Sequence, residues 1–149
     1  MKTKILISAC LCGKNTKYNG KNNEIKEISK LKEVFDFVLI CPEVMGGLSI
    51  PRNPSEIQKD KIISNQGKDV TKEYVLGAKR ALQIACKNKI KFALLKEASP
   101  SCGSSLVYDG TFSNKKISGE GITTKRLREQ GVMVFNETQI DELLDMVKL

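Results

Sequence analysis

The sequence of 149 residues contains no histidine, few aromatic side chains and no apolar stretch that approaches a membrane span. Without histidine, general acid–base catalysis must rely on Glu, Asp, Lys, Tyr, Ser or Cys, and a soft-metal site must consist mostly of thiolates. The sequence also shows no linker, low-complexity tract or internal repeat. These absences favour one compact domain over residues 1–149, long enough to bury a core without disulfides.

A positive charge dominates, but it is not gathered into a motif. Twenty-five Lys and Arg against seventeen Asp and Glu give a formal charge of +8, which favours anionic partners such as nucleic acid. The lysines are scattered, and neither an arginine cluster nor an aromatic-interleaved stripe is present. Nucleic acid is therefore not indicated as a partner, although a basic RNA-binding module stays open as an alternative.

The N-terminal segment MKTKILISAC has the charge pattern of a signal peptide, but its apolar run is too short. Only residues 5–9 separate Lys4 from Cys10, whereas a signal core requires about 7 to 15 apolar residues. We interpret the run as a buried first strand. The five cysteines are an odd number spread along the chain, unlike the framework of a small secreted protein. We therefore expect a reducing, cytoplasmic location and no membrane partner.

Short apolar runs alternate with helical patterns along the chain. The runs, rich in Val, Ile, Leu and Phe, are typical of buried parallel strands and cover residues 4–10, 35–41, 91–95 and 132–135. Apolar stripes at helical spacing fall between or after them, at residues 25–35, 75–86 and 140–147. This order predicts an α/β fold, a three-layer Rossmann-like domain with a parallel sheet of about four strands.

Two local signals add detail to this fold. Thr138 and Asp141 have the spacing of a capping box before the last helix. The segment 42–70 contains prolines, a GG pair and the turn NQG, so we expect it to be an insertion with a loop and a small hairpin.

Three cysteines stand where ligand sites form in open α/β sheets. Cys10 and Cys41 end the first two predicted strands, and Cys102 lies just beyond the third. Cys41 follows Cys10 by 31 positions, which matches one βαβ unit of roughly 30 residues and places the two strand ends side by side. Ligands bind beyond the carboxyl ends of such strands. The pattern predicts a shared metal or catalytic thiol site.

The other two cysteines have less distinctive surroundings. Cys86 follows Leu82 by four residues on an apolar helical stripe, so we expect a small buried hydrophobic side chain. Cys12 is either a fourth ligand, through its C-x-C spacing with Cys10, or a small loop residue.

Five ordered segments surround these cysteines and extend over nearly the whole chain. They are SACLCG with KYNG (8–13 and 17–20), CPEVMGGLSIPR (41–52), GKDVT (67–71), SPSCG (99–103) and YDGTFSNKKISGEGIT (108–123). Together they resemble the short bacterial thiouracil desulfidase family. The resemblance implies an α/β protein that holds a 4Fe-4S cluster with three cysteines, and by motif the ligands are Cys10, Cys41 and Cys102. The fourth iron would be free to take the sulfur of a thiolated uracil.

The same resemblance implies an activity and the residues that support it. Glu43 matches the acid–base glutamate of the family, and Ser99 matches its active-site serine, with Ser101 as a weaker substitute. The expected reaction is a hydrolysis without net electron transfer. It converts a small thiolated pyrimidine, such as 2- or 4-thiouracil or a related nucleoside, to uracil and hydrogen sulfide. The oligomeric state is not predicted.

Further residues of these segments have weaker predicted roles. Glycines can let the backbone approach cluster or substrate closely, or can simply form turns, at Gly46, Gly47 and Gly103. Other side chains either line the pocket or have surface and turn roles, namely Lys17, Tyr18, Arg52 and Asp69.

The chain departs from the usual family pattern at Lys17, Cys12 and Asn114, and Cys12 matters most. A fourth thiolate from Cys12 would give a closed site of four cysteines with zinc or iron–sulfur, and a structural or electron-transfer function. Side chains two residues apart around a strand end reach the same metal only if the loop turns. We expect Cys12 to point away and the fourth iron to stay open.

Overall fold

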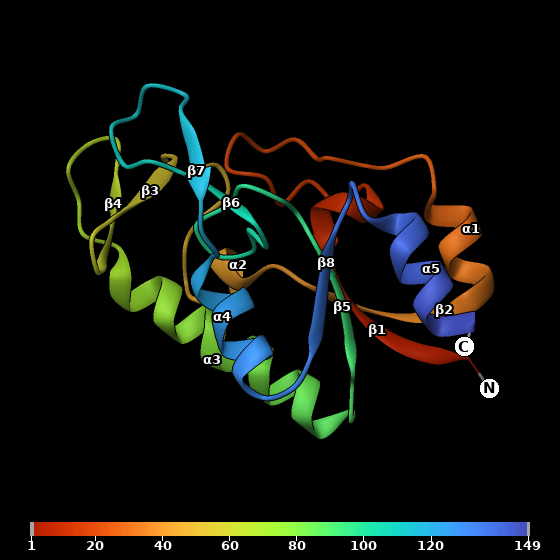
Figure 1. The fold of residues 1–149 in the computed structure, drawn as a ribbon. Coiled ribbons are helices and arrows are strands. Elements are labelled where there is room, and N and C mark those ends of the chain that lie inside the picture. Colours follow the sequence, from red (N-terminus) through yellow and green to blue (C-terminus); the bar gives the residue numbers. More distant parts are fainter. Residues whose placement is uncertain (1, 149) are drawn as a thin grey trace.

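The centre of the protein is a four-stranded parallel sheet with the strand order β2-β1-β5-β8 (Figure 1). The computed structural model describes residues 2–148, so the predicted domain extends one residue beyond it at each end. The strands are β1 (Thr3–Ser8), β2 (Phe35–Ile40), β5 (Phe92–Leu95) and β8 (Met133–Asn136). They overlap the four predicted apolar runs, with β1 beginning one residue before its run and β8 ending one residue after its run, and the predicted parallel sheet is confirmed.

Helices cover both faces of this sheet, which gives the predicted three layers (Figure 1). The helices are α1 (Ile28–Val34), α3 (Thr71–Lys87), α4 (Ile122–Glu129) and α5 (Ile140–Lys148). Ile5 and Ile7 of β1 belong to the apolar cluster that contains residues of α1 and α5. Leu6 points to the other face, into the cluster with α3 and α4. Burial on both faces explains why the central strands β1 and β5 carry continuous apolar runs.

The N-terminal apolar run is a buried strand, as predicted. Ile5, Leu6 and Ile7 are fully buried in β1. Its place in the middle of the sheet, between β2 and β5, accounts for this burial. No helix within residues 2–148 has both the length and the apolar character needed to cross a membrane.

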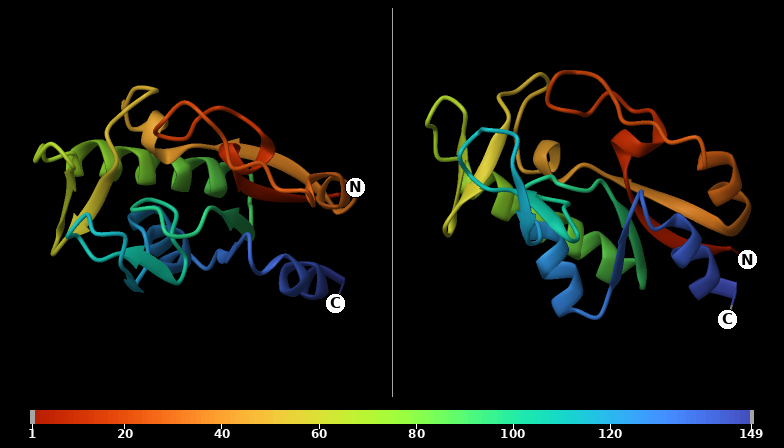
Figure 2. Two further views of the ribbon diagram at one scale, coloured as in Figure 1. Left: turned by 90° about the horizontal axis from the view of Figure 1, so that it is seen from above. Right: turned by 45° about the horizontal axis from the view of Figure 1, so that its top comes forward.

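Two antiparallel hairpins lie at one end of the molecule, away from α5 (Figure 2). The first, β3 (Ser55–Gln58) with β4 (Lys61–Ser64), is the hairpin predicted within 42–70. The second, β6 (Leu106–Tyr108) with β7 (Lys116–Ser118), was not predicted. The buried Glu56 joins them by accepting the N–H groups of Gly110 at 3.0 Å and Phe112 at 3.2 Å.

The predicted helix boundaries need two corrections. Ile25 precedes α1 and Phe35 already belongs to β2, so α1 is shorter than its apolar stripe. The predicted capping box is also wrong, because Thr138 donates both its N–H and its hydroxyl to Asn136 Oδ1, at 2.8 and 2.6 Å. The Asn136 side chain forms a local turn with the residue two positions later, and this turn uses the Thr138 hydroxyl that a capping box would need.

Candidate active site

The three predicted ligand cysteines all line one cavity of about 520 Å³ at the carboxyl ends of the central strands. Cys10 lies in the 3-10 helix η1 (Ala9–Cys12) that follows β1. Cys41 stands between β2 and the short helix α2 (Pro42–Met45), and Cys102 lies in the loop after β5. Because β1 lies between β2 and β5, the strand ends bring together residues that are far apart in the sequence. All five cysteines are free thiols.

Local turns fix the position of each thiol. Gly13 ends η1 with a φ of 84°, a left-handed conformation that favours glycine. Pro42 occupies the first turn of α2, where its fixed φ suits the helix start directly after Cys41. Ser99 Oγ accepts the N–H groups of Ser101 at 3.1 Å and Cys102 at 3.0 Å, which closes a tight turn around the third thiol.

Burial makes two of the cavity thiols harder to deprotonate than a thiol in water. Burial raises the pKa of the Cys102 thiol to about 12, and the nearby Glu43 and Cys41 add to the effect. Burial also raises the pKa of Cys10, with a further contribution from Cys41. A thiol must lose its proton to bind a metal as a thiolate. Metal binding at this cavity would therefore release protons.

Glu43 connects the thiol sites to two serines through its carboxylate. Arg52 Nε donates to Glu43 Oε1 at 3.0 Å, and the two side chains are only 7% and 15% exposed. Ser101 Oγ lies 3.0 Å from Glu43 Oε2, and Ser99 Oγ lies 3.3 Å from the same oxygen. Ser101 Oγ is also 3.4 Å from Cys102 Sγ. One carboxylate oxygen is thus anchored and the other faces the hydroxyl groups.

The partners of Glu43 are themselves held in place. Arg52 donates to the carbonyl of Thr16 at 2.9 Å and to that of Ser49 at 3.3 Å. Tyr74 is buried beside the carboxylate, and burial together with the Glu43 charge raises its pKa above the usual range. Arg52 is therefore a buried partner of the glutamate rather than a surface residue.

Cys12 and Cys86 lie outside this arrangement. Cys12 is not among the residues that line the cavity, and it packs against the apolar cluster beside α1 and α5. Cys86 is exposed, which corrects the predicted burial. The buried stripe of α3 ends at Ala81 and Ala85, and a helix turns by about 100° per residue, so Cys86 faces away from it.

The remaining predicted residues divide between the cavity and local packing. Lys17, Tyr18 and Asn114 line the cavity. Asp69 does not line it, and instead accepts the Thr71 N–H at 2.9 Å at the start of α3. Gly47 adopts a φ of 100° in a turn.

The other two predicted glycines fit tight packing of the protein itself. A Cβ at Gly46 would overlap the carbonyl oxygen of Glu73 in α3. A Cβ at Gly103 would lie 2.5 Å from the Leu106 carbonyl oxygen and 2.9 Å from that of Ser99. The close approach at these glycines is therefore between backbone segments.

Two polar residues next to the site were missed by the sequence analysis. Glu97 follows β5 and Asn136 ends β8, and Asn136 Nδ2 donates to Glu97 Oε2 at 2.6 Å. Both stand at carboxyl ends of parallel strands, so the rule that selected the cysteines would also have selected them.

The donor set suits an iron–sulfur cluster. Soft thiolates select metals such as zinc, Cu(I) and iron–sulfur clusters, and three free thiols line the cavity. Among residues 2–148, no group of three or more His, Cys, Asp or Glu is placed to bind a single metal ion. A cluster takes each thiolate on a different iron, so it accepts ligands spread around a cavity. The Thr16 hydroxyl, buried in the cavity wall without a partner, is a free donor there.

This fold and site define an α/β protein with a thiol-lined cavity and an adjoining glutamate–serine pair. The sequence model of the 2-thiouracil desulfurase family matches residues 5–139. The chain is 40% identical over 150 residues to the Bacillus subtilis (strain 168) protein YbbK, described as uncharacterized, covering 94% of this chain and 99% of that protein. A solved structure, the [4Fe-4S]-dependent thiouracil desulfidase TudS, has a TM-score of 0.93 and 42% identity, covering 99% of each chain.

The chain belongs to the 2-thiouracil desulfurase family. The resemblance found in the motifs is thereby confirmed, as is the predicted α/β fold.

Proposed function

We propose that this protein is a 4Fe-4S-dependent desulfidase that uses water to convert a thiolated uracil to uracil and releases hydrogen sulfide. The observation that carries the proposal is that Cys10, Cys41 and Cys102 line the same cavity as Glu43 and Ser99. Membership of the 2-thiouracil desulfurase family supports it, as does the likeness to a desulfidase whose name states its dependence on such a cluster.

Cys10, Cys41 and Cys102 would hold the cluster through their thiolates. When bound, such a cluster supplies a Lewis-acidic iron for the sulfur of a thiocarbonyl group. Clusters are normally held by four thiolates. Cys12 is absent from the cavity lining, so this arrangement leaves one ligand position for the substrate, in the way that a catalytic metal site keeps an open position.

Glu43 is the general base in this proposal. Oε1 is paired with Arg52 Nε, so Oε2 takes a proton from the attacking water. The ion pair also holds the carboxylate in one orientation. Ser99 and Ser101 hydroxyls, both within hydrogen-bonding distance of Oε2, orient the water and the substrate beside it.

The reaction balances without an electron donor or acceptor. The water oxygen forms a bond to the ring carbon that carries sulfur, and the carbon–sulfur bond then breaks. Both protons of the water leave with the sulfur as hydrogen sulfide, one of them by way of Glu43. The ring carbon has the same oxidation state in thiouracil and in uracil, so the reaction is a hydrolysis.

Anaerobic turnover tests this function. We expect the reconstituted, brown protein to remove the thiocarbonyl absorbance of 2-thiouracil or 4-thiouracil and to release one sulfide per uracil. The control is the Cys102→Ser variant taken through the same reconstitution, which should do neither. A fully loaded parent protein that leaves both compounds unchanged would contradict the proposal and favour a structural or electron-transfer cluster.

A further inference from the structure

The Glu97 carboxylate accepts many hydrogen bonds from the loop that contains Cys102. Oε1 accepts four backbone N–H groups, from Ala98 at 3.0 Å, Ser104 at 2.8 Å, Ser105 at 3.2 Å and Leu106 at 3.2 Å. These donors come from both ends of the segment 98–106. Glu97 thus ties the two ends of the segment together.

The second oxygen of Glu97 fastens the same loop to the sheet. Oε2 accepts the Ser105 hydroxyl at 2.6 Å, the Ser104 hydroxyl at 3.4 Å and Asn136 Nδ2 at 2.6 Å. Asn136 is 2% exposed at the end of β8, and its Nδ2 also donates to Ser104 Oγ at 2.7 Å. The neighbouring strand therefore contributes a rigid donor.

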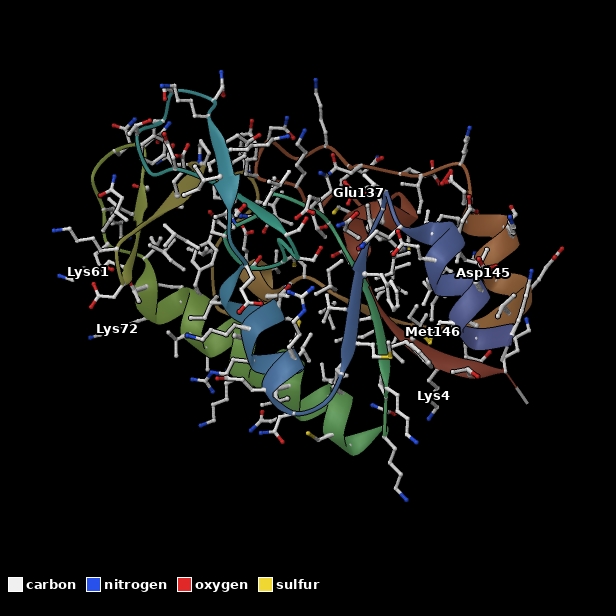
Figure 3. The ribbon with its side chains drawn as sticks, in the orientation of Figure 1. Lys4, Lys61, Lys72, Glu137, Asp145 and Met146 are labelled. Carbon is white, nitrogen blue, oxygen red and sulfur yellow. The ribbon has the colours of Figure 1, made fainter. Side chains whose placement is uncertain are left out.

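The backbone of Glu97 is held as well. Glu137 Oε1 accepts the Glu97 N–H at 2.8 Å. Figure 3 shows Glu137 just after β8, at the end of the sheet opposite to Lys4. Ala98, the next residue, has a φ of 68°, a backbone conformation that is unfavourable for residues other than glycine. The contacts of Glu97 maintain this turn at the start of the loop.

The loop between these anchors contains the reactive groups, although Glu97 does not hydrogen-bond to them. Ser99, Ser101 and Cys102 lie within 98–106. The two hydroxyls lie within hydrogen-bonding distance of Glu43 Oε2, and the Cys102 thiol lies 3.4 Å from the Ser101 hydroxyl. Burial by itself would raise the pKa of Glu97, but the Ser105 hydroxyl and the N–H groups of Ala98, Ser105 and Ser104 lower it to about 2. The carboxylate is therefore ionised at neutral pH, when its acceptor capacity is greatest.

We propose that Glu97, with Asn136 as its donor, is a positioning residue that holds the 98–106 loop so that Cys102 and the two serines face the cavity. The inference deepens the proposed function and rests on it for the roles of those three residues. Residues that orient metal ligands affect metal affinity or activity by about 10- to 100-fold.

The hydrogen bond between Glu97 and Asn136 can be tested by exchanging the acceptor and the donor between the two positions. In Glu97→Gln, the amide NH2 group would face Asn136 Nδ2, and two donors would meet. In the double variant Glu97→Gln/Asn136→Asp, the new carboxylate at position 136 accepts from the new amide at position 97. We therefore expect the double variant to recover much of what the single variant loses.

Hydrogen exchange of the metal-free protein measures the loop directly. In Glu97→Gln, we expect the amides of Ala98, Ser104, Ser105 and Leu106 to exchange at least about tenfold faster, because the oxygen that accepts their hydrogen bonds loses its charge and these bonds weaken. The strand amides of β1 should keep the exchange rates of the parent. The exposed carboxylate of Glu129 provides the control variant Glu129→Gln, which should behave as the parent.

The second readout is the loss of iron from the loaded protein to a chelator. We expect iron to leave Glu97→Gln about 10- to 100-fold faster than the parent, and the double variant to approach the parent rate. If Glu97→Gln does not fold, Ser105→Ala removes one donor from an exposed position and should still accelerate exchange in the loop by several-fold.

Two results would overturn the inference. One is parent-like exchange and iron retention in Glu97→Gln. The other is faster exchange throughout the protein without recovery in the double variant, which would mean general destabilisation. Because the exchange experiment needs neither cluster nor substrate, an inactive parent protein would contradict the proposed function and leave the loop measurement unaffected.

Discussion

At the scale of single residues, the two carboxylate oxygens of Glu43 have different surroundings. Oε1 faces Arg52, and Oε2 faces the hydroxyls of Ser99 and Ser101. A buried ion pair contributes little net stability, but the loss of one partner is costly because a charge is left unpaired. Arg52 therefore holds the carboxylate in place, which leaves Oε2 available for the proton transfer that we propose.

The Glu43→Gln variant tests this assignment. The amide keeps an oxygen for Arg52 but has no basic site for the proton of water. We expect the variant to keep its iron and to lose activity by about 10²- to 10⁴-fold, as measured by sulfide release. Glu33→Gln, at an exposed position of α1, is the matched control. Unchanged turnover in Glu43→Gln would remove Glu43 from the mechanism.

Iron content separates the five cysteines. We expect Cys10→Ser, Cys41→Ser and Cys102→Ser each to lose nearly all bound iron, because each thiol of the cavity is required. Cys12→Ala and Cys86→Ser should keep both iron and activity, since neither side chain lines the cavity. Iron per protein is measured after the same anaerobic reconstitution. Loss of iron from Cys12→Ala would instead indicate a closed four-thiolate site.

The lowered pKa of Glu97 leads to a prediction of how the stability of the fold depends on pH. Although burial alone would raise its pKa, hydrogen bonds lower that pKa in the folded protein from 4.5 to about 2. A lowered pKa means that the ionised group stabilises the fold above its unfolded pKa, and that this contribution disappears as the pH falls toward the folded value. In the metal-free protein, the free energy of unfolding in urea should therefore fall less in Glu97→Gln than in the parent between about pH 5 and pH 2. Equal pH dependence would contradict the assignment.

At the scale of elements, the contact between α2 and α3 sets the position of Glu43. Gly46 faces the carbonyl of Glu73, and Gly77 faces the carbonyl of Pro42. Two helix backbones therefore touch directly, at glycines on both sides. Glu43 is the next residue after Pro42, so the packing of α3 fixes the position of the proposed general base in the cavity lining.

Gly77→Ala tests this contact. Helix propensity alone would favour alanine by about 1 kcal/mol, but the new Cβ would overlap the Pro42 carbonyl. We expect net destabilisation of about 1 to 3 kcal/mol and a lower turnover, because α2 must shift. Urea unfolding measures the first effect and sulfide release the second. Leu76→Ala, on the exposed side of the same helix, is the control, and a stabilised Gly77→Ala would refute the argument.

The elements that sequence analysis predicted are those with a strong apolar signal. The central strands β1 and β5 are buried on both faces along most of their length, and the edge strands β2 and β8 also consist mostly of apolar residues, although Leu39 and Met133 are exposed. In contrast, α4 buries Leu127 as its only large apolar side chain, and the two strands β6 and β7 are three residues each. Such segments depend on contacts with the rest of the chain, which a local pattern does not contain.

The site was predictable to the extent that strand ends determine it. The convergence of Cys10, Cys41 and Cys102 follows from the order of parallel strands. The roles of Glu97 and Asn136 instead depend on hydrogen bonds between residues 39 positions apart in the chain. The exposure of Cys86 depends on which face of α3 meets the sheet, and an apolar stripe with several candidate residues does not fix that face.

At the scale of the whole molecule, the cavity is built from two parts of the chain: the carboxyl ends of the sheet strands, and segments that lie outside the sheet. The sheet supplies the thiols at the ends of β1, β2 and β5, while residues beyond the sheet supply the opposite side of the cavity. Among these, Arg52 precedes the first hairpin, and Tyr108 and Phe112 belong to the second. The cavity is thus lined by segments from most of the chain, which can shield a small substrate from bulk solvent.

The most direct test of the central claim is the origin of the oxygen in the product. The reconstituted protein is incubated anaerobically with thiouracil in ¹⁸O-labelled water, and uracil and sulfide are quantified by mass spectrometry and colorimetry. We predict one ¹⁸O atom in each uracil, at the carbon that carried sulfur, and one sulfide released per uracil. Uracil without ¹⁸O, or a fully loaded protein that forms no uracil, would contradict the hydrolytic mechanism proposed for this cavity.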